Sequence, residues 1–382
     1  EACGRILAEN IISRYDIPPR NISAVDGYAV RSQDTSSASA KQPLKLKIMG
    51  ELFPTSAQCG SSLLTGQAMY VACGAPIPDG SDAVIRVEDT IRKGDEIEIR
   101  RPIENYKNVI LAGEDVKQGS IVLSKGHILR PQDIGLLAAL RITKVNVFKK
   151  PRVAIISVGD ELTSLKGGEP SKTINNYAFI ISAAASEFGA LPEIVGIAPD
   201  NISEIAKKIK KALTIAEIII TIGGCSVGVK DFVPDAVSTI GKPGVITHGV
   251  KISPGKVTGL GVIEGKPIVM LPGHIASCIA GFYLFVVPLI RLYSGLPAFC
   301  APKISAKISQ DVKAKYGLKL FLRVRVSKID GEFIAEPIYG GSSSLNTLIR
   351  SSGFTILDEG TFVKMGDKVT VTLFSDKELL KL

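Results

Sequence analysis

The stretch "EIIITIGGCSVGVKDF", residues 217–232, joins an apolar run to a glycine-rich turn that is followed by an acid, Asp231. A short run of β-branched residues bounded by turn residues predicts a buried strand. The glycines allow a tight turn and a close approach of a ligand, and the first N–H groups of a following helix attract phosphate. The same glycines could simply reverse the chain over a sheet, because G-G-x-S-x-G is neither a Walker loop nor a dinucleotide fingerprint.

Apolar runs of this kind alternate with helical patterns throughout residues 151–297, as in "RVAIISV" before "INNYAFIISAAASEFG". The alternation predicts an α/β domain with a mainly parallel sheet covered by helices on both faces. Ligands of such sheets bind at the carboxyl ends of the strands. Four loops fall at these ends and could line one crevice: Gly159-Asp160-Glu161, Pro199-Asp200-Asn201, Gly223-Gly224-Cys225-Ser226 and Pro272-Gly273-His274.

The regions before and after residues 151–297 have the sequence patterns of β-strands. Within the N-terminal region, residues 1–150, residues 43–130 have the pattern of short strands with turn signals and predict a small β-domain, and the Ser-rich segment 32–43 is expected to be an exposed connector. Residues 298–382 contain a hairpin pattern, "KLFLRVRVSKIDGEFIAEPI", and a period-two run, "DKVTVTLFS". They predict a small C-terminal β-domain, so the chain is a multidomain α/β plus β protein.

Composition limits the classes of function. The chain has 382 residues, of which 45% are apolar. This is enough for two to four domains with hydrophobic cores that need no disulfides or structural metal to fold. Its six cysteines include no C-x-x-C pair, which favours a reducing, cytoplasmic setting over a disulfide scaffold or zinc ribbon. A net charge of +9 permits an anionic ligand, while the absence of Trp and the 6% aromatic content disfavour nucleic acid.

The apolar run "IASCIAGFYLFVVPLI", residues 275–290, is the one candidate for a membrane span in the sequence. It is shorter than the roughly 20 residues that a span needs, and it contains Pro288. It therefore predicts a buried core helix, and we expect a cytoplasmic protein without a membrane partner.

Acidic residues mark the Gly- and Pro-rich loops. Several carboxylates in one cleft repel each other, so they would share a proton or hold a divalent cation. Each acid also has an ordinary structural explanation: Asp200 as a helix N-cap, Asp26 as a turn residue, and Asp231 as a first-turn acid of a helix. The acids concerned are Asp26, Asp115, Asp160, Glu161, Asp200 and Asp231.

Basic residues flank a second turn, Pro254-Gly255. Lys251 and Lys256 lie on either side of it, and a lysine there could meet a phosphate or an oxyanion, although a solvated surface lysine is the simpler explanation. The three histidines have no metal-ligand spacing and are expected to cap or pack. They are His127, His248 and His274.

The order of motifs along nearly the whole chain resembles the molybdopterin molybdenumtransferases, the family that includes the gephyrin E domain. The motifs include "NISAVDGYAVRSQD", "ACGAPIPDGSDAVIRVED", "TIGGCSVGVKDF", "SPGKVTGLG" and "LPGHIASCIAGF". The resemblance implies an elongated homodimer with a site shared between subunits. Each subunit would carry a segmented N-terminal region, a molybdopterin-binding α/β domain and a C-terminal β-barrel. It also implies insertion of molybdate into adenylylated molybdopterin, with release of AMP and dependence on Mg²⁺ or another divalent cation.

The family pattern assigns roles to residues of this chain. The acidic active-site positions correspond to Asp26, Asp115, Glu161, Asp200 and Asp231, of which Glu161, Asp200 and Asp231 would hold the metal. The positions that bind the cofactor correspond to Cys73, Gly223, Gly224, Ser226, Lys256 and Pro272. The resemblance further implies small-molecule substrates and contacts with other proteins of molybdenum cofactor biosynthesis.

Five residues depart from the family pattern near this site: Cys73, Gly249, Ser253, His274 and Ile275. A thiol replaces the usual hydroxyl at position 73, and lysines are replaced at positions 249 and 253. These changes leave open a catalytically weak paralogue that binds molybdopterin or molybdate as a carrier, sensor or assembly partner. A nucleotide-cleaving hydrolase is a third interpretation, but it would not explain the flanking β-regions.

Overall fold

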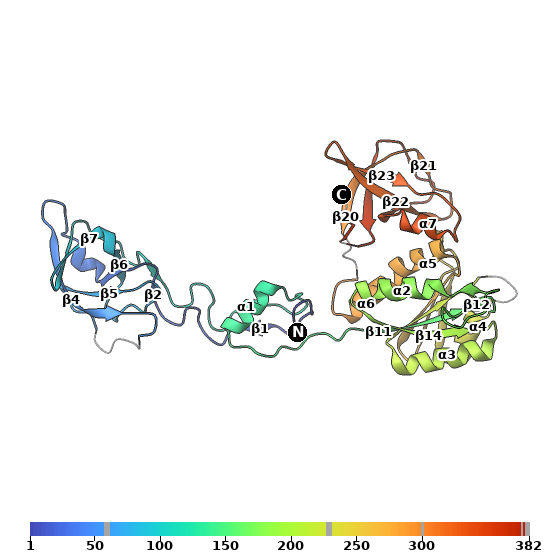
Figure 1. The fold of residues 1–382 in the computed structure, drawn as a ribbon, viewed down its shortest axis with the longest axis horizontal. Helices are drawn as coiled ribbons and strands as arrows, with labels where there is room; N and C mark the ends of the chain where they lie inside the picture. Colours follow the sequence, from blue (N-terminus) through green and yellow to red (C-terminus); the bar gives the residue numbers. More distant parts are fainter. Residues whose placement is uncertain (57–61, 227–230, 299–301, 376, 379–382) are drawn as a thin grey trace. The chain divides into compact units, whose positions relative to one another are not determined.

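The fold is described from a computed structural model of the chain (Figure 1), which describes all residues except 57–61, 227–230, 299–301, 376 and 379–382. The chain divides into two compact units, Glu1–Val147 and Phe148–Leu382. Each unit has its own hydrophobic cores and is treated separately below.

The unit Glu1–Val147 is built mainly from short strands. One sheet has the order β6-β3-β5-β4-β8-β7 and buries apolar side chains on both of its faces. Its strands are β3 (Gly27–Val30), β4 (Leu44–Leu52), β5 (Gln67–Val71), β6 (Ala83–Arg86), β7 (Thr90–Lys93) and β8 (Glu96–Ile99). Smaller pairs and one helix complete the unit: β1 (Ile11–Ile12) with β10 (Ile121–Leu123), β2 (Ile22–Ser23) with β9 (Val109–Ile110), and α1 (Pro131–Ala139).

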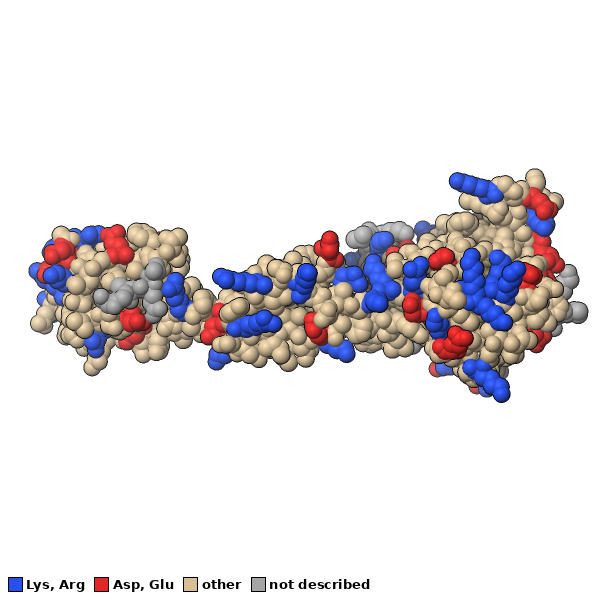
Figure 2. Space-filling view, turned by 90° about the horizontal axis from the view of Figure 1, so that it is seen from below, with Lys and Arg blue, Asp and Glu red and all other residues tan. Residues whose placement is uncertain are grey.

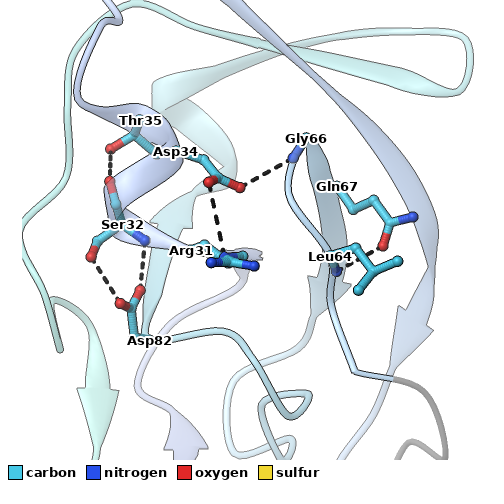
Figure 3. A network of polar contacts seen from close by, with 8 residues as sticks. All are labelled: Arg31, Ser32, Asp34, Thr35, Leu64, Gly66, Gln67 and Asp82. Atoms are coloured by element: carbon cyan, nitrogen blue, oxygen red, sulfur yellow. Dashed lines mark hydrogen bonds and ion pairs between the residues drawn. The ribbon is translucent and has the colours of Figure 1, made fainter.

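The Ser-rich segment 32–43 differs from the expected exposed connector at its start. Residues Ser32–Thr35 form a short 3₁₀ helix, η1, and Thr35 is fully buried. Figure 3 shows the cause: the carboxylate of Asp82 accepts hydrogen bonds from the backbone N–H and the hydroxyl of Ser32, at 2.6 and 2.9 Å. Asp34 in turn accepts a 3.1 Å bond from the N–H of Gly66. Distant carboxylate and amide groups therefore fold a segment whose composition suggested a loop.

The second unit begins with the predicted α/β domain. Its sheet has the order β14-β11-β15-β19-β18-β16, in which β14, β11, β15 and β19 are parallel and β18 and β16 are antiparallel additions. The strands are β11 (Arg152–Val158), β14 (Leu191–Ala198), β15 (Ile218–Ile222), β16 (Pro243–His248), β18 (Gly259–Ile263) and β19 (Lys266–Leu271). The expected mainly parallel sheet is confirmed.

Helices cover both faces of this sheet (Figure 1) because alternate residues of its strands are apolar on both sides. One core contains Val153 and Ile155 with α2 (Asn176–Glu187) and α5 (Ile275–Gly281). The other contains Ala154 and Ile156 with α3 (Ile202–Ile215) and α4 (Val233–Ile240). A small pair, β12 (Leu162–Thr163) and β13 (Thr173–Ile174), follows β11.

The apolar run near residue 280 is a core helix, as expected. Helix α5 continues through the π-helical turn η3 (Phe282–Val286) into α6 (Val287–Tyr293). Within the described residues, Ile275–Tyr293 is the one helix that is long and apolar enough to cross a membrane. Its side chains at Ile279, Phe282 and Ile290 are buried against the sheet, so its hydrophobicity is explained by the core.

The C-terminal part is a closed β-barrel, which confirms the predicted barrel. Strands β22, β23, β20, β26 and β24 pair in that order, and β24 pairs back with β22. The elements of this part are β20 (Lys303–Ile308), β21 (Val312–Lys313), β22 (Lys319–Ile329), β23 (Glu332–Pro337), α7 (Leu345–Ile349), β24 (Gly353–Leu357), β25 (Phe362–Val363) and β26 (Lys368–Leu373).

A short strand of the α/β domain joins the barrel. Strand β17 (Ile252–Ser253) pairs in parallel with the start of β22, and the N–H of Lys319 donates to the carbonyl of Lys251 at 3.0 Å. The turn that follows β17 is therefore held from the barrel side as well as from the α/β domain.

Candidate active site

The loop Gly223–Ser226, called the glycine loop below, leaves β15 at the carboxyl edge of the sheet. Gly223 and Gly224 have φ angles of 91° and 63°, in the left-handed region that favours glycine. A Cβ at position 223 would lie 2.5 Å from the carbonyl oxygen of Val158, and one at 224 would lie 2.9 Å from a Val158 methyl. Both glycines are therefore required by conformation and by close packing against β11.

Hydrogen bonds fix each residue of the glycine loop. The N–H of Gly223 donates to the carbonyl of Leu271 at 2.9 Å, and the carbonyl of Gly224 accepts from Val233 at 2.9 Å. The N–H of Ser226 donates to the carboxylate of Asp231 at 2.8 Å. The thiol of Cys225 points into the core, where burial and the charge of Asp231 raise its pKa to about 12. It is thus a structural side chain and no nucleophile.

A cleft with a volume of about 810 Å³ opens where β11, β15 and β19 end. It has the size of a small-molecule site and a mixed polar lining. The four loops that the sequence suggested for one crevice all contribute to it. Among the predicted site residues, it is lined by Glu161, Asp200, Gly223, Gly224, Ser226, Asp231, Lys256 and Pro272.

Neither Asp200 nor Asp231 has the helix-terminus role that could have explained it. The N-cap of α3 is Asn201, whose side chain accepts bonds from the N–H groups of Ser203 and Glu204, so the N-cap explanation of Asp200 is wrong. Helix α4 begins at Val233, so Asp231 lies before it, outside the first turn. Both carboxylates belong instead to the lining of the cleft.

Asp160 and Asp200 form a reciprocal pair on neighbouring loops. The N–H of Asp160 donates to the carboxylate of Asp200 at 3.3 Å, and the N–H of Asp200 donates to that of Asp160 at 3.1 Å. The carboxylate of Glu161 folds over Gly159, where an added Cβ would lie 2.4 Å from it. Within the described residues it has no hydrogen-bond or ion-pair partner. The cleft thus gathers negative charge on adjacent loops.

Cationic and imidazole groups differ in their access to the cleft. Lys251 and Lys256 are both exposed, but only Lys256 lines the cleft, and its ammonium group has no partner in the described part of the chain. His274, expected to cap or pack, is the N-cap residue of α5, but its side chain makes no capping hydrogen bond and lines the cleft instead. The Nε2 atom of His248 lies 2.6 Å from the carbonyl oxygen of Cys225.

His127 has the structural role expected for it. Its Nε2 atom lies 2.7 Å from the carboxylate of Asp133, near the start of α1. The Arg130 guanidinium first, and His127 to a smaller extent, hold the pKa of the Asp133 carboxyl well below its usual range, against the effect of burial.

The remaining predicted site residues belong to the unit Glu1–Val147. The N–H of Cys73 donates to the carboxylate of Asp26 at 2.9 Å, and its thiol lies 3.3 Å from the carbonyl of Ala24. Two residues far apart in sequence are therefore neighbours. Asp115 lies on another turn of this unit, where its N–H donates to the carbonyl of Ile17 at 3.0 Å, and its side chain is exposed.

The sequence missed lining residues at the start of α2. Asn175 is buried and accepts a 2.7 Å bond from the hydroxyl of Ser157, and Tyr177 lies beside it in the lining. Burial raises the pKa of the Tyr177 hydroxyl. No sequence motif identifies Asn175 and Tyr177 as lining residues. They reach the cleft only because β13 directs the chain there before α2 begins.

The acids of the cleft are not arranged as a preformed metal-binding site. In the described ranges, no three Asp, Glu, His or Cys side chains come together as metal ligands. Carboxylates on adjacent loops nevertheless suit Mg²⁺, which takes one or two protein carboxylates and completes its shell with water and substrate phosphates.

Comparison with known families matches three consecutive regions. Residues 1–140 match "MoeA N-terminal region (domain I and II)", residues 154–292 match "Probable molybdopterin binding domain", and residues 305–374 match "MoeA C-terminal region (domain IV)". The cleft described above lies in the second of these regions, with its rim close to the third.

Individual relatives agree. The molybdopterin molybdenumtransferase of Staphylococcus epidermidis is 32% identical over 98% of this chain and 89% of its own length, and that of Staphylococcus aureus is 33% identical over 86% and 78%. The solved molybdopterin biosynthesis MoeA protein of Pyrococcus horikoshii superimposes with a TM-score of 0.87 at 34% identity, covering 98% of this chain and 93% of that one. The chain belongs to the molybdopterin molybdenumtransferase family and is an enzyme of molybdenum cofactor biosynthesis.

Proposed function

We propose that the cleft binds adenylylated molybdopterin and that the protein inserts molybdate into its dithiolene, with release of AMP. The observation that supports this proposal is the meeting of the glycine loop, several carboxylates and Lys256, whose ammonium group has no partner among the described residues, in one cleft. A substrate with phosphates and a second, anionic substrate need both a backbone cradle and a cation. A carrier that only stores the pterin would have no use for the additional acids.

The residues divide this work by their chemistry. Gly223, Gly224 and Ser226 are proposed to hold the pterin phosphate through the backbone, with Pro272 shaping the cleft from the adjacent loop after β19. Lys256 is proposed to attract the oxyanion, because an ammonium group in a partly dehydrated cleft gains more from an anion than it would in water. Helix α3 carries Lys207, Lys210 and Lys211, and Figure 2 shows Lys and Arg side chains with acidic ones among them on the face that it draws. The net charge of +9 would raise the local concentration of anions.

A divalent cation, Mg²⁺ being the first choice, is proposed to bind among Glu161, Asp200 and Asp231, through one or two of these carboxylates together with substrate phosphates and water. When bound, it would neutralise the charge of the adenylate phosphates. The exposure of these carboxylates to one cleft and the Asp160–Asp200 pair support this ligand set. Asp26 and Asp115 are proposed as further catalytic acids, and Cys73 as a binding residue.

We also propose that the protein is a cytoplasmic homodimer. Ile12 and Ile121 face each other across β1 and β10 and are 52% and 55% exposed, as expected of a surface that another chain covers. An obligate interface typically buries more than about 2,000 Å². Light scattering that shows only monomer at micromolar concentration would rule the dimer out. Contacts with other proteins of the same pathway are proposed on the family relationship alone.

The test of the proposed function is direct. The protein is incubated with adenylylated molybdopterin, Mg²⁺ and molybdate, and AMP release is followed together with formation of the molybdenum cofactor. The proposal expects both products in equal amounts. Tight pterin binding without AMP release would favour the carrier, and AMP release without molybdenum insertion would favour a hydrolase.

A further inference from the structure

We propose that His248 is a positioning residue of the active site, which holds the glycine loop and the carboxylate of Asp231 in place through one shared peptide bond. His248 is not among the described residues that line the cleft, so it would act through the loop and not on the substrate. The proposal rests on the proposed use of this cleft for the pterin substrate.

The shared peptide bond joins Cys225 and Ser226. Its carbonyl oxygen lies 2.6 Å from Nε2 of His248, and its N–H donates to Oδ1 of Asp231 at 2.8 Å. The C=O and N–H groups of a trans peptide point in opposite directions from one rigid plane. His248 and Asp231 therefore hold the Cys225–Ser226 peptide group from opposite sides. Loss of either hydrogen bond would allow this peptide group to rotate more freely.

The direction of the His248 bond is set by its partner. A carbonyl oxygen can only accept, so Nε2 carries the proton. An imidazole donates from a protonated Nε2 whether the ring is neutral or cationic, so the bond does not require a particular charge on the ring.

The fold places His248 where the loop needs support. Strand β16, against which α4 packs, lies three places from β15 in the sheet, and the N–H of Gly223 already bonds to the last residue of the intervening strand β19. His248 is the last residue of β16, and its register partner on β18 is Gly259. A Cβ at 259 would lie 2.5 Å from the Met270 methyl and at an ordinary contact distance, 3.4 Å, from the His248 ring, so the ring lies beside position 259 and the glycine there is required by Met270.

His248 also connects the loop with the second turn of the cleft. Gly249, directly after it, donates from its N–H to the carbonyl of Thr258 at 3.0 Å, and Val250 donates to the carbonyl of Lys256 at 2.8 Å. The strand that presents His248 to the glycine loop thus continues into the segment that presents Lys256 to the cleft. One strand end sets the positions of both anion-binding elements.

A matched pair of variants tests the role. His248→Gln keeps a donor at nearly the position of Nε2, whereas His248→Met has similar length and no donor. Loss of the bond leaves the Cys225 carbonyl without its partner, so we expect His248→Met to raise KM for adenylylated molybdopterin roughly tenfold with kcat changed less than about twofold. His248→Gln should restore KM to near the wild-type value, with an unchanged pH profile of kcat. Ile246→Ala, an exposed site on the same strand, is the control.

A second measurement needs no substrate. Hydrogen exchange of the Ser226 amide in the free protein should accelerate in His248→Met and not in His248→Gln. Equal exchange in the two variants would overturn the positioning role and leave the proposed function intact. Faster exchange in His248→Met with an unchanged KM would also overturn it, because the loop that His248 holds would then not bind the pterin.

Discussion

The backbone N–H of Cys73 donates a 2.9 Å hydrogen bond to the carboxylate of Asp26, and the thiol of Cys73 lies 3.3 Å from the carbonyl of Ala24. On the side of residue 73 the first contact uses only the backbone N–H, so it survives any substitution there except proline. The second depends on a weak S–H donor.

We therefore expect Cys73→Thr to be at least as active as the wild type. The threonine hydroxyl can replace the thiol at the Ala24 carbonyl with a stronger bond, worth about 0.5–1.5 kcal/mol. Cys73→Val has the same shape without the hydroxyl and is the matched control. Initial rates of AMP release and thermal unfolding of both variants check this, and equal behaviour of Thr and Val would show that the side-chain contact has no role.

The glycine loop should not tolerate a methyl group. Gly223→Ala places a Cβ 2.5 Å from the Val158 carbonyl in addition to the strain of a positive φ. Gly265→Ala is the matched control, since φ is 74° there and no atom lies within 4 Å. We expect the control to lose only about 1–2 kcal/mol of stability and to keep its affinity for the pterin substrate, whereas Gly223→Ala loses binding. Equilibrium titration with substrate distinguishes the two, and equal affinities would contradict the proposed phosphate loop.

Of the two lysines near Pro254, only Lys256 should affect molybdate. Removing one charge-assisted contact costs about 1.5–3 kcal/mol, so Lys256→Met should raise the molybdate concentration for half-maximal insertion roughly ten- to a hundredfold. Lys251→Met removes the same charge from an exposed position outside the lining and should leave this concentration near the wild-type value. If both variants shift it equally, the effect is one of general charge.

Asp231→Asn separates the charge of this residue from its hydrogen bond. The amide oxygen can still accept from the N–H of Ser226, so the loop keeps its conformation while the negative charge is lost. We expect weaker Mg²⁺ binding and slower AMP release, measured by metal titration at constant substrate. An unchanged metal titration would remove Asp231 from the proposed ligand set.

The buried cysteines predict a dependence on alkaline pH. Burial raises the pKa of Cys225 to about 12 and that of Cys278 further, while an unfolded cysteine titrates near 8.5. Because the folded pKa values are raised, their contribution to stability is present below about pH 8.5 and falls as the pH rises towards 12. At pH 8, mass spectrometry after alkylation should find Cys3 and Cys73 modified and Cys225 and Cys278 intact. Early modification of Cys225 would show that the glycine loop opens.

Local patterns predicted the elements that bury a continuous apolar face. The alternation of Ile218–Ile222 with amphipathic α3 predicted the parallel sheet, and the hairpin at β22 and β23 predicted part of the barrel. The loops that follow parallel strands all lie at the carboxyl edge of the sheet. The shared cleft could therefore be predicted from the strand pattern alone.

Contacts between distant residues could not be predicted in this way. The 3₁₀ helix at Ser32 depends on Asp82, fifty positions away, and composition alone suggested an exposed connector. Asn201 and not Asp200 is the N-cap of α3 because the helix begins one residue later than the sequence suggested, and sequence patterns do not fix a helix start to one residue. The contact of His248 with Cys225 joins β16 to the loop after β15, three places away in the sheet, which no sequence spacing reveals.

The pairing of β17 with β22 bears on how this protein can be recombined. Because Ile252 and Ser253 are register partners of Lys319 and Leu320, the backbone that leads into Lys256 is shared between two structural domains. A barrel transplanted from a relative must therefore match this two-residue seam to preserve the cleft. Consider a chimera joined at residue 298 in which β17 and β22 do not pair correctly. Both of its domains would fold, but Lys256 would be displaced from the cleft.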